Sequence, residues 1–324
     1  MSAPRPCPAE VAVVPVGSYV GRTALVTGAG SGIGRAVAHR LVELGAIVVG
    51  VGRRIAPLEE TAAGSPAPER MRVQALDIRD RGATSDFVES LGPLDLLVNN
   101  AGGQFIAPAT AISARGFAAV ADLNLTAIAA TIRAAHPALA RAAHADLTRG
   151  AHVDLTRGAH VDLTRGAHVD LTRGAHADMT RGAHVDLTRG AQRGPARMGA
   201  RVVTLSLTAP DRGSAGMVHS TTARAALAGL TRTLARTWRD DGIALFCLAP
   251  GTVHTAGVAG ELPAATLQRV VDSTPFGRDT SLHEVAEWVA ALGTGIADAV
   301  SGSFIEIDGG AGLVDAASRM LDDA

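Results

Sequence analysis

The stretch Thr27-Gly28-Ala29-Gly30-Ser31-Gly32-Ile33-Gly34 decides the fold of this chain. It follows the short apolar run Thr23–Val26 and opens the segment Ile33–Leu44, in which apolar residues recur at helical spacing. Glycines between a strand and a helix permit a tight turn and let the backbone approach a pyrophosphate, which then binds the N–H groups of the helix. The stretch therefore predicts a dinucleotide-binding loop at the start of an α/β domain.

Short apolar runs continue along the chain, bounded by turn residues and separated by segments with helical spacing. The runs are Thr23–Val26, Ile47–Val51, Met71–Leu76, Leu94–Val98, Val202–Leu207, Ile243–Leu248 and Phe304–Ile307. Nearly continuous apolar strands that alternate with helices are typical of a parallel sheet covered on both faces. We predict one Rossmann-like, doubly wound α/β domain over residues 21–324, with about seven parallel strands flanked by helices, after a flexible arm of residues 1–20.

Residues 143–190 interrupt this alternation with six near-identical octapeptides, the first being Ala143-His144-Ala145-Asp146-Leu147-Thr148-Arg149-Gly150. A period of eight advances a helix by about 80° per copy, so the apolar positions cannot form a continuous helical stripe. The glycine and the few apolar residues in each copy favour a mobile, solvated insert. One alternative is a self-associating β segment, because eight is a multiple of the strand period. The other is a metal site, against which one histidine per copy without cysteine argues.

The insert is expected between a helix that ends near Ala142 and a strand that starts near Arg201. In a parallel sheet this connection lies at the amino ends of the strands, opposite the ligand crevice. We therefore expect the insert not to touch the active site.

The composition is that of an ordinary globular protein, with 47% hydrophobic and 19% charged residues and a net charge of −1. This balance gives no broad electrostatic reason to bind nucleic acid or a membrane. The apolar run Val11–Val16 is too short for a signal-peptide core or a membrane span. Two cysteines, Cys7 and Cys247, do not make a disulfide framework. We expect a cytoplasmic protein with reduced thiols and no metal.

Further motifs follow the later strands in a consistent order. They are Asp77-Ile78 after the third strand, Asn99-Asn100-Ala101-Gly102 after the fourth, Leu123-Asn124-Leu125-Thr126, Pro250-Gly251-Thr252-Val253-His254-Thr255 after the sixth and Asp308-Gly309-Gly310 after the seventh. With the glycine-rich loop, they resemble the short-chain dehydrogenase/reductase family over nearly the whole chain outside the arm and the insert. The resemblance implies an oxidoreductase that uses a nicotinamide dinucleotide and a small-molecule substrate.

The resemblance also implies which residues hold the cofactor. They are Gly28, Ser31, Gly32, Ile33 and Gly34 on the loop, Asp77 and Ile78 at the adenine, Asn100, Ala101 and Gly102 along the ribose, Arg224 at the nicotinamide ribose, and Pro250, Gly251, Val253 and Thr255 near the nicotinamide. At the end of the second strand, where an NAD-preferring site has an acid, this chain has Arg53 and Arg54. A guanidinium binds a 2′-phosphate through paired hydrogen bonds, so we predict that NADP(H) is preferred over NAD(H). The alternative is that both arginines only solvate a loop.

The catalytic positions depart from the family pattern. The chain contains no lysine and a single tyrosine, Tyr19, whereas the family's chemistry usually runs on a Tyr-x-x-x-Lys pair. By the resemblance, Ser220 stands at the tyrosine position and Arg224 at the lysine position, while Asn124 matches the family. A serine hydroxyl is a much poorer acid than such a tyrosine, and arginine stays protonated and cannot relay protons. Ordinary carbonyl reduction is therefore disfavoured.

We assign roles to the catalytic candidates accordingly. Asn124 holds a structural water or kinks its helix, Ser220 donates a hydrogen bond to a thioester oxygen, and Arg224 holds the ribose and supplies positive charge. His219 is either a proton donor or a solvated residue at the start of its helix. A substrate-orienting serine is expected where this chain has Leu207, with a serine one residue earlier.

Two stretches, Val98–Phe105 and Val218–Ala225, look like the peroxisomal trans-2-enoyl-CoA and 2,4-dienoyl-CoA reductase branch. The likeness makes Gln104 and Phe105 candidates for the acyl pocket, with Phe105 as plain core the alternative. Hydride addition to the β-carbon of an enoyl thioester builds an enolate that hydrogen bonds can stabilise. We therefore predict an NADP(H)-dependent enoyl-thioester reductase.

Two alternatives remain, a carbonyl reductase with a rebuilt site and a non-catalytic NADP(H)-binding protein. The resemblance further implies a homodimer or homotetramer, paired through the helix before the insert and the helix from Ser220. The segment Ala256–Val271 is expected to be a mobile substrate lid.

Overall fold

The computed structural model describes residues 13–151, 199–208, 216–255, 268, 271–272 and 274–313, with only the backbone described for 146–151. Three sequence predictions therefore fall wholly or mostly outside the described residues. They concern the arm over residues 1–12, the insert over residues 152–190 and most of the lid at 256–271.

The core of the fold is a sheet of seven parallel strands in the order β3-β2-β1-β4-β5-β6-β7. The strands are β1 Thr23–Thr27, β2 Ile47–Gly52, β3 Met71–Ala75, β4 Leu96–Asn99, β5 Ala200–Leu205, β6 Ile243–Pro250 and β7 Phe304–Ile307. The chain crosses from one half of the sheet to the other between β3 and β4, so β1 and β4 are neighbours, with Leu25 paired to Leu97. The predicted doubly wound parallel fold is confirmed.

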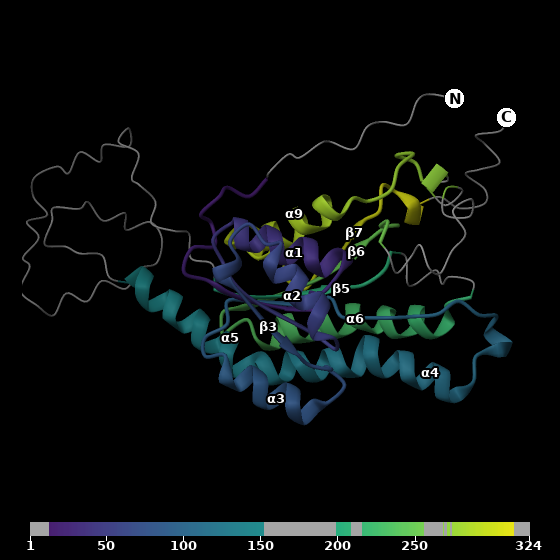
Figure 1. The fold of residues 1–324 in the computed structure, drawn as a ribbon, viewed down its shortest axis with the longest axis horizontal. Helices are drawn as coiled ribbons and strands as arrows, with labels where there is room; N and C mark the ends of the chain where they lie inside the picture. The colour runs from purple at the N-terminus through teal and green to yellow at the C-terminus, as the bar shows by residue number, and fades with distance from the viewer. Residues whose placement is uncertain are drawn as a thin grey trace, which may run out of the picture.

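Helices cover both faces of the sheet (Figure 1). They are α1 Gly32–Glu43, α2 Ile55–Ala63, α3 Arg81–Ser90, α4 Ala114–Ala121, α5 Ala127–Ala151, α6 Val218–Thr237 and α9 Leu282–Leu292. On one face α1 packs against α9, and on the other α3 packs against α5, with α6 beside it. The five inner strands β2, β1, β4, β5 and β6 are buried almost throughout, which explains why they read as continuous apolar runs, whereas the edge strands β3 and β7 are partly exposed.

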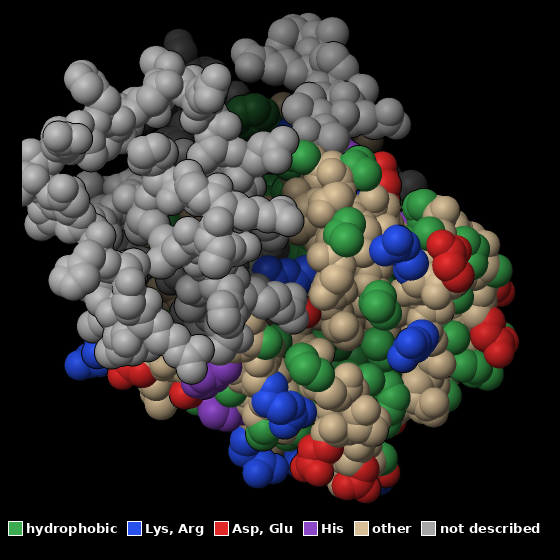
Figure 2. All heavy atoms as spheres, turned by 90° about the vertical axis from the view of Figure 1, so that its left-hand side faces the viewer, with side chains coloured by type: hydrophobic (Ala, Val, Ile, Leu, Met, Phe, Trp, Pro, Cys, Tyr) green, Lys and Arg blue, Asp and Glu red, His purple; other side chains and the backbone are tan. Residues whose placement is uncertain are grey.

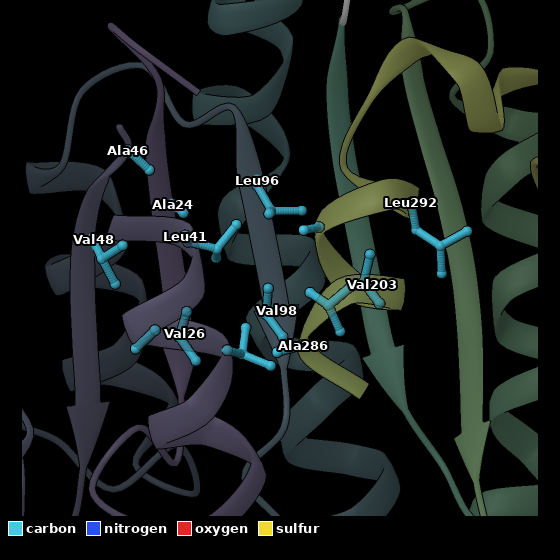
Figure 3. Close-up of a cluster of buried hydrophobic side chains, with 14 of the residues drawn as sticks. Ala24, Val26, Leu41, Ala46, Val48, Leu96, Val98, Val203, Ala286 and Leu292 are labelled. Atoms are coloured by element: carbon cyan, nitrogen blue, oxygen red, sulfur yellow. The ribbon is translucent and has the colours of Figure 1, made fainter. Parts of the chain in front are cut away.

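The core under α1 and α9 is built from aliphatic side chains (Figure 3). Leu41 of α1 and Ala286 of α9 point onto strand residues such as Val26 and Val98, and all four are almost fully buried. Burying a side chain of the size of leucine contributes about 1.5–3 kcal/mol. This packing holds the strand ends, and therefore the loops that follow them, in fixed relative positions.

The N-terminal segment is attached to the domain from residue 13 onward. The carboxylate of Glu287, on α9, accepts hydrogen bonds from the backbone N–H groups of Val13 (2.9 Å) and Val14 (3.3 Å) and pairs with the buried guanidinium of Arg40. The Tyr19 hydroxyl donates to the carbonyl of Ala290 at 2.5 Å, and the ring is 1% exposed. The predicted arm of residues 1–20 therefore has a packed portion, residues 13–20.

Helix α5 continues to Ala151, beyond the end predicted near Ala142. Alanine has the highest helix propensity of all residues, and the first octapeptide begins Ala143-His144-Ala145, so nothing there stops the helix. Ala142 and Ala143 are buried, which adds packing to propensity. The helix projects from the amino end of the sheet, on the left of Figure 1.

One stretch, Ala114–Ala145, is long and apolar enough to cross a membrane by length and composition, with a mean hydropathy of 1.3. It comprises α4, a short turn and most of α5, whose inner side chains Ile128, Ile132 and Leu139 are buried in the core. Core helices of globular domains pass the same test, so the stretch is weak evidence for a membrane span.

Candidate active site

A cavity of about 440 Å³ lies at the carboxyl ends of the strands, where the chain crosses between the two halves of the sheet. Such a crossing point is where open α/β sheets bind their ligands. The structure brings most of the predicted cofactor residues to its wall: Gly28, Ser31, Gly32, Ile33, Arg53, Arg54, Asp77, Ile78, Asn100, Ala101, Gly102, Arg224, Pro250 and Thr255. Gly34, Gly251 and Val253 are not part of the cavity lining.

The glycine-rich loop needs its glycines for two different reasons. Gly28 and Gly32 have φ angles of 69° and 52°, a region that residues with a Cβ rarely adopt. Gly34 instead lies so close to the carbonyl oxygen of Gly28 and the side-chain amide of Asn100 that a Cβ would overlap them. The loop can therefore turn sharply and let α1 begin directly beneath it, with its first N–H groups facing the cavity end.

The loop after β1 is tied to the loop after β4 by a small hydrogen-bond network. The side-chain amide of Asn100 donates to the carbonyls of Thr27 (2.9 Å) and Gly28 (3.2 Å). In return the Thr27 hydroxyl accepts from the backbone N–H groups of Asn100 and Ala101, both at 3.0 Å. Thr27 was not among the predicted site residues, although a hydroxyl at the last residue of the first strand was a visible signal.

Arg35 braces the same loop from the other side. Its guanidinium donates to the carbonyl of Gly30 at 2.8 Å and to the Thr61 hydroxyl at 3.0 Å, and lies 3.4 Å from a carboxylate oxygen of Glu60. The arginine thus joins the glycine-rich loop to α2. This role could not be inferred from the sequence, because the partners lie 26 residues apart.

The end of the cavity beside β2 carries positive charge. Arg53 and Arg54 are exposed there, and neither makes a hydrogen bond or salt bridge within the described part of the chain. Asp77, across from them, is held by Arg79, whose guanidinium contacts both carboxylate oxygens at 2.5 and 3.0 Å. The hydrogen bonds from Arg79 keep the pKa of the Asp77 carboxyl below its usual value. The acid is therefore ionised but already neutralised by Arg79.

Asn124 sits in a turn of π-helix, Asp122–Thr126, between α4 and α5. Its amide nitrogen donates to the carbonyl of Gly103 at 2.7 Å, and its amide oxygen accepts from the N–H of the same residue at 3.1 Å. The helix thus departs from regular α-helical geometry at Asn124, while the structural water or kink stays a prediction. The side chain, which is 1% exposed, fixes the loop after β4 at the cavity wall.

Ser220 does not reach the cavity directly. It is fully buried near the start of α6, and its hydroxyl donates to the amide oxygen of Gln104 at 2.8 Å. Gln104, in contrast, lines the cavity next to Gly103. The sequence had assigned the hydrogen bond to substrate to Ser220. The structure places the glutamine amide at the wall, and Ser220 orients it from behind.

His219 is fully buried, which excludes the solvated position considered for it. Neither ring nitrogen has a hydrogen-bond partner among the described residues, and the ring packs edge-on against Phe105 with centroids 4.3 Å apart. His219 is not part of the cavity wall, so this structure does not bring it into contact with a ligand there. Phe105 is 40% exposed and is not plain core.

Arg224 supplies the positive charge of the inner cavity. Its side chain lies close to Gly102, where an added Cβ would stand 3.0 Å from a guanidinium nitrogen. Ser206 also lines the cavity, and its hydroxyl donates to the Arg224 carbonyl at 3.4 Å, whereas Leu207 does not line it. The serine at the position before the expected one is thus the residue at the wall. Burial raises the pKa of the neighbouring Cys247 thiol to about 12.

The segment after β6 forms part of the cavity wall. Pro250 and Thr255 line the cavity, and Val253 is buried beneath it. Gly251 donates its N–H to the carbonyl of Ile307, and a Cβ on Gly251 would come within 2.8 Å of the Asp308 backbone. Glycine is therefore needed there for β6 and β7 to meet.

Two family models match the chain before and after the middle of the repeats, and each overlaps one end of them. Residues 22–147 match the short chain dehydrogenase model, and residues 176–312 match the enoyl-(acyl carrier protein) reductase model of the same family. The chain belongs to the short-chain dehydrogenase/reductase family. As a member of that family it is an oxidoreductase, and its fold binds a nicotinamide cofactor.

Relatives over most of the chain point to one branch of the family. The Bacillus subtilis protein named "Probable 2,4-dienoyl-CoA reductase" is 29% identical over 89% of this chain and 96% of its own length. The peroxisomal 2,4-dienoyl-CoA reductase of Danio rerio is 25% identical over 91% and 83%, respectively. This family member therefore resembles the dienoyl-CoA reductase branch.

Solved structures share the fold. A citronellol catabolism dehydrogenase from Pseudomonas aeruginosa superposes with a TM-score of 0.65 at 28% identity, covering 93% of this chain and 99% of its own. A structure from Beutenbergia cavernae, described as an NAD(P) dependent gluconate 5-dehydrogenase with bound NADP at low occupancy, gives a TM-score of 0.69 at 25% identity, covering 92% and 100%. The glycine loop with its positive φ angles and the cationic end of the cavity fit such a dinucleotide.

Proposed function

We propose that this short-chain dehydrogenase/reductase uses NADPH to reduce a carbon–carbon double bond of an enoyl thioester. The observation that carries the proposal is the Ser220–Gln104 pair: Ser220, which the resemblance aligns with the family's tyrosine, bonds to Gln104, and Gln104 lines the cavity. The full-length likeness to 2,4-dienoyl-CoA reductases supports the same substrate class.

The acid–base chemistry of the available groups favours enoyl over carbonyl reduction. Reducing a ketone leaves an alkoxide that must take a proton at once, and the chain has no lysine to acidify a donor. Its single tyrosine, Tyr19, is buried beneath α9, and burial raises the pKa of its phenol far above the usual value. An enolate oxygen, in contrast, needs only hydrogen-bond donors, which an amide can supply.

The proposal gives a role to each of three residues around the cavity. The bound nicotinamide would supply the hydride to the β-carbon. The amide of Gln104 donates to the thioester oxygen as charge develops on it, and the Ser220 hydroxyl, bonded to the amide oxygen at 2.8 Å, holds the amide in that orientation. Arg224 stabilises the negative charge electrostatically without giving up a proton. The α-carbon takes its proton from water, which completes the reduction.

We further propose that NADPH is preferred over NADH. Arg53 and Arg54 are exposed at the cavity end where the adenine ribose is expected, and Asp77, the acid nearest to them in that wall, is neutralised by Arg79. A 2′-phosphate would therefore meet guanidinium donors and no uncompensated carboxylate. The neighbouring structure with bound NADP is consistent with this choice.

The test follows NADPH oxidation by the purified full-length protein. The substrates are a medium-chain trans-2-enoyl-CoA, a 2,4-dienoyl-CoA and a 3-oxoacyl-CoA, each also run with NADH. We expect oxidation with an enoyl or dienoyl substrate and at least about tenfold lower kcat/KM with NADH, the worth of one lost charge-assisted bond. Oxidation with the oxoacyl substrate alone would refute the mechanism. Tight NADPH binding without turnover of any of the three would favour the non-catalytic alternative.

We also propose a homodimer or homotetramer, located in the cytoplasm and bound to neither nucleic acid nor membrane. Light scattering on the eluted protein tests the assembly. A monomer at micromolar concentration would contradict it.

A further inference from the structure

A second cavity lies at the amino ends of the strands, opposite the candidate active site. Its volume is about 860 Å³, and its described lining comes from the starts of β5, β6 and β7, the last turns of α6 and the 3₁₀ turn Gly295–Val300. At about 3.3 Å per residue, the length of β5 separates the two cavities by roughly 15–20 Å. They share no lining residue and are separate sites.

The described lining of the second cavity holds four arginines and a single carboxylate. The arginines are Arg201, Arg232, Arg236 and Arg239, and the carboxylate is Asp298. Arg201 pairs with Asp298 at 2.5 Å, and Arg239 pairs at 3.0 Å with an aspartate that is not part of the lining. The charge left over is therefore carried by Arg232 and Arg236.

Arg232 and Arg236 stand one helical turn apart on the same side of α6. Both are exposed, and neither makes a hydrogen bond or a salt bridge with any described residue. Like charges four residues apart on a helix repel each other. A cationic pair of this kind is stabilised by an anion that bridges the two guanidinium groups, and phosphate oxygens match the guanidinium fork.

A helix end accounts for part of this charge but not for all of it. Arg236 lies in the last turn of α6, where a cation complements the helix dipole. Arg232 lies a full turn earlier, where the stabilisation by the helix dipole has largely decayed. The dipole therefore explains the position of Arg236 and leaves that of Arg232, beside the cavity, without an explanation.

The hollow also has an apolar side. Phe304 and Ala235 are partly buried in its wall, with Ile243 and Ala244 buried beside them. A volume of about 860 Å³ exceeds the need of a bare phosphate and falls in the range of small-molecule sites. A ligand with both an anionic end and a flat ring would satisfy the two sides together.

We propose that this second cavity binds a nucleoside phosphate, with the phosphates on Arg232 and Arg236 and the base against Phe304. Figure 2 views this end of the molecule, with the described arginine side chains in blue. The inference does not depend on the proposed reaction, because the cavity lies outside the crevice. Two sources share the chemistry, a free nucleotide and the nucleotide portion of an acyl carrier such as coenzyme A.

The test is calorimetric titration of the full-length protein with its crevice saturated with NADP⁺. ADP and coenzyme A are the two probes, and the variants are Arg232→Ala, Arg236→Ala and Arg232→Glu/Arg236→Glu. Arg133→Ala, an exposed arginine of α5 outside both cavities, is the matched control. Each alanine should weaken the second binding event about tenfold, as expected for loss of a charge-assisted bond. The double charge reversal should abolish it, and the control should leave it unchanged.

The two probes also separate the sources. Equal binding of ADP and coenzyme A would support a free nucleotide as ligand, and stronger binding of coenzyme A would support the carrier. No second event with either probe up to about 5 mM, or equal binding to wild type and the double variant, would overturn the proposal. Arg53→Ala should weaken NADP⁺ binding only, so failure of the cofactor assignment is distinguishable from failure of the second site.

Discussion

Replacing Glu287 with alanine would remove the carboxylate that joins α9 to α1 and to the N-terminal segment. The side chains of Glu287 and Arg40 are 5% and 6% exposed, so the variant leaves a buried guanidinium without its main partner. Breaking a buried ion pair from one side costs about 3–5 kcal/mol. Arg40 keeps a second contact at 2.9 Å to the half-exposed Glu43, and we therefore expect the lower end of that range, about 3 kcal/mol.

The assay is equilibrium unfolding in urea, followed by circular dichroism on the full chain. At about 2–4 °C per kcal/mol for a domain of this size, the same loss should lower the Tm by roughly 6–12 °C. Glu43→Ala is the matched control, since it removes only the exposed contact and should cost less than about 1 kcal/mol. If Glu287→Ala unfolded within about 1 kcal/mol of wild type, the N-terminal segment would not be held by this carboxylate.

Three further predictions concern the crevice and the core. Arg35→Ala should raise the Kd for NADPH about tenfold with a smaller effect on kcat, because the arginine acts through the Gly30 carbonyl; fluorescence titration measures the Kd, and an unchanged value would contradict the brace. Gln104→Ala should lower kcat by about 10²–10³-fold, as for other lost oxyanion donors, and should leave the affinity for NADPH intact. Ser220→Ala should lower kcat by less. A larger loss of kcat for Ser220→Ala in steady-state kinetics would reverse the two roles. Because burial raises the pKa of Cys247 to about 12, its thiol stays protonated at pH 8 and should resist iodoacetamide in the folded Cys7→Ser variant. The thiol should react only when the protein unfolds or when the pH approaches that value. Rapid alkylation at pH 8, detected by mass spectrometry, would contradict the burial of Cys247.

The strands and the doubly wound parallel sheet could be predicted from the sequence. Each inner strand is short, buried on both faces and bounded by turn residues, so its apolar run stands out without any alternation. The end of α5 could not be placed, because the first octapeptide continues an alanine-rich helix and carries no stop signal until its glycine.

The packing of the N-terminal segment could not be predicted from local sequence patterns. Residues 13–20 have no periodicity, and their attachment depends on Glu287, more than 270 residues away in the chain. A glutamate in a largely apolar helix gives no indication of its partner. Contacts of this kind are settled by tertiary packing alone.

The candidate site divides in the same way. Backbone requirements at Gly28 and Gly32 were visible, because glycine at a strand-to-helix turn has few other causes. The relation between Ser220 and Gln104 was not visible, since it depends on which way a helical side chain points and on a loop 116 residues earlier. Likewise, the sequence could not predict that the His219 ring would be buried and packed against Phe105 rather than solvated.

The chain leaves the sheet along α5 and returns at Gly199, and both points lie at the edge remote from the crevice. Repeated coding units are prone to unequal recombination, and each octapeptide is a whole number of codons. Gain or loss of a copy therefore preserves the reading frame and changes the chain in steps of eight residues. Because both attachment points lie away from the crevice, we expect a change in copy number to leave the residues around the crevice in place.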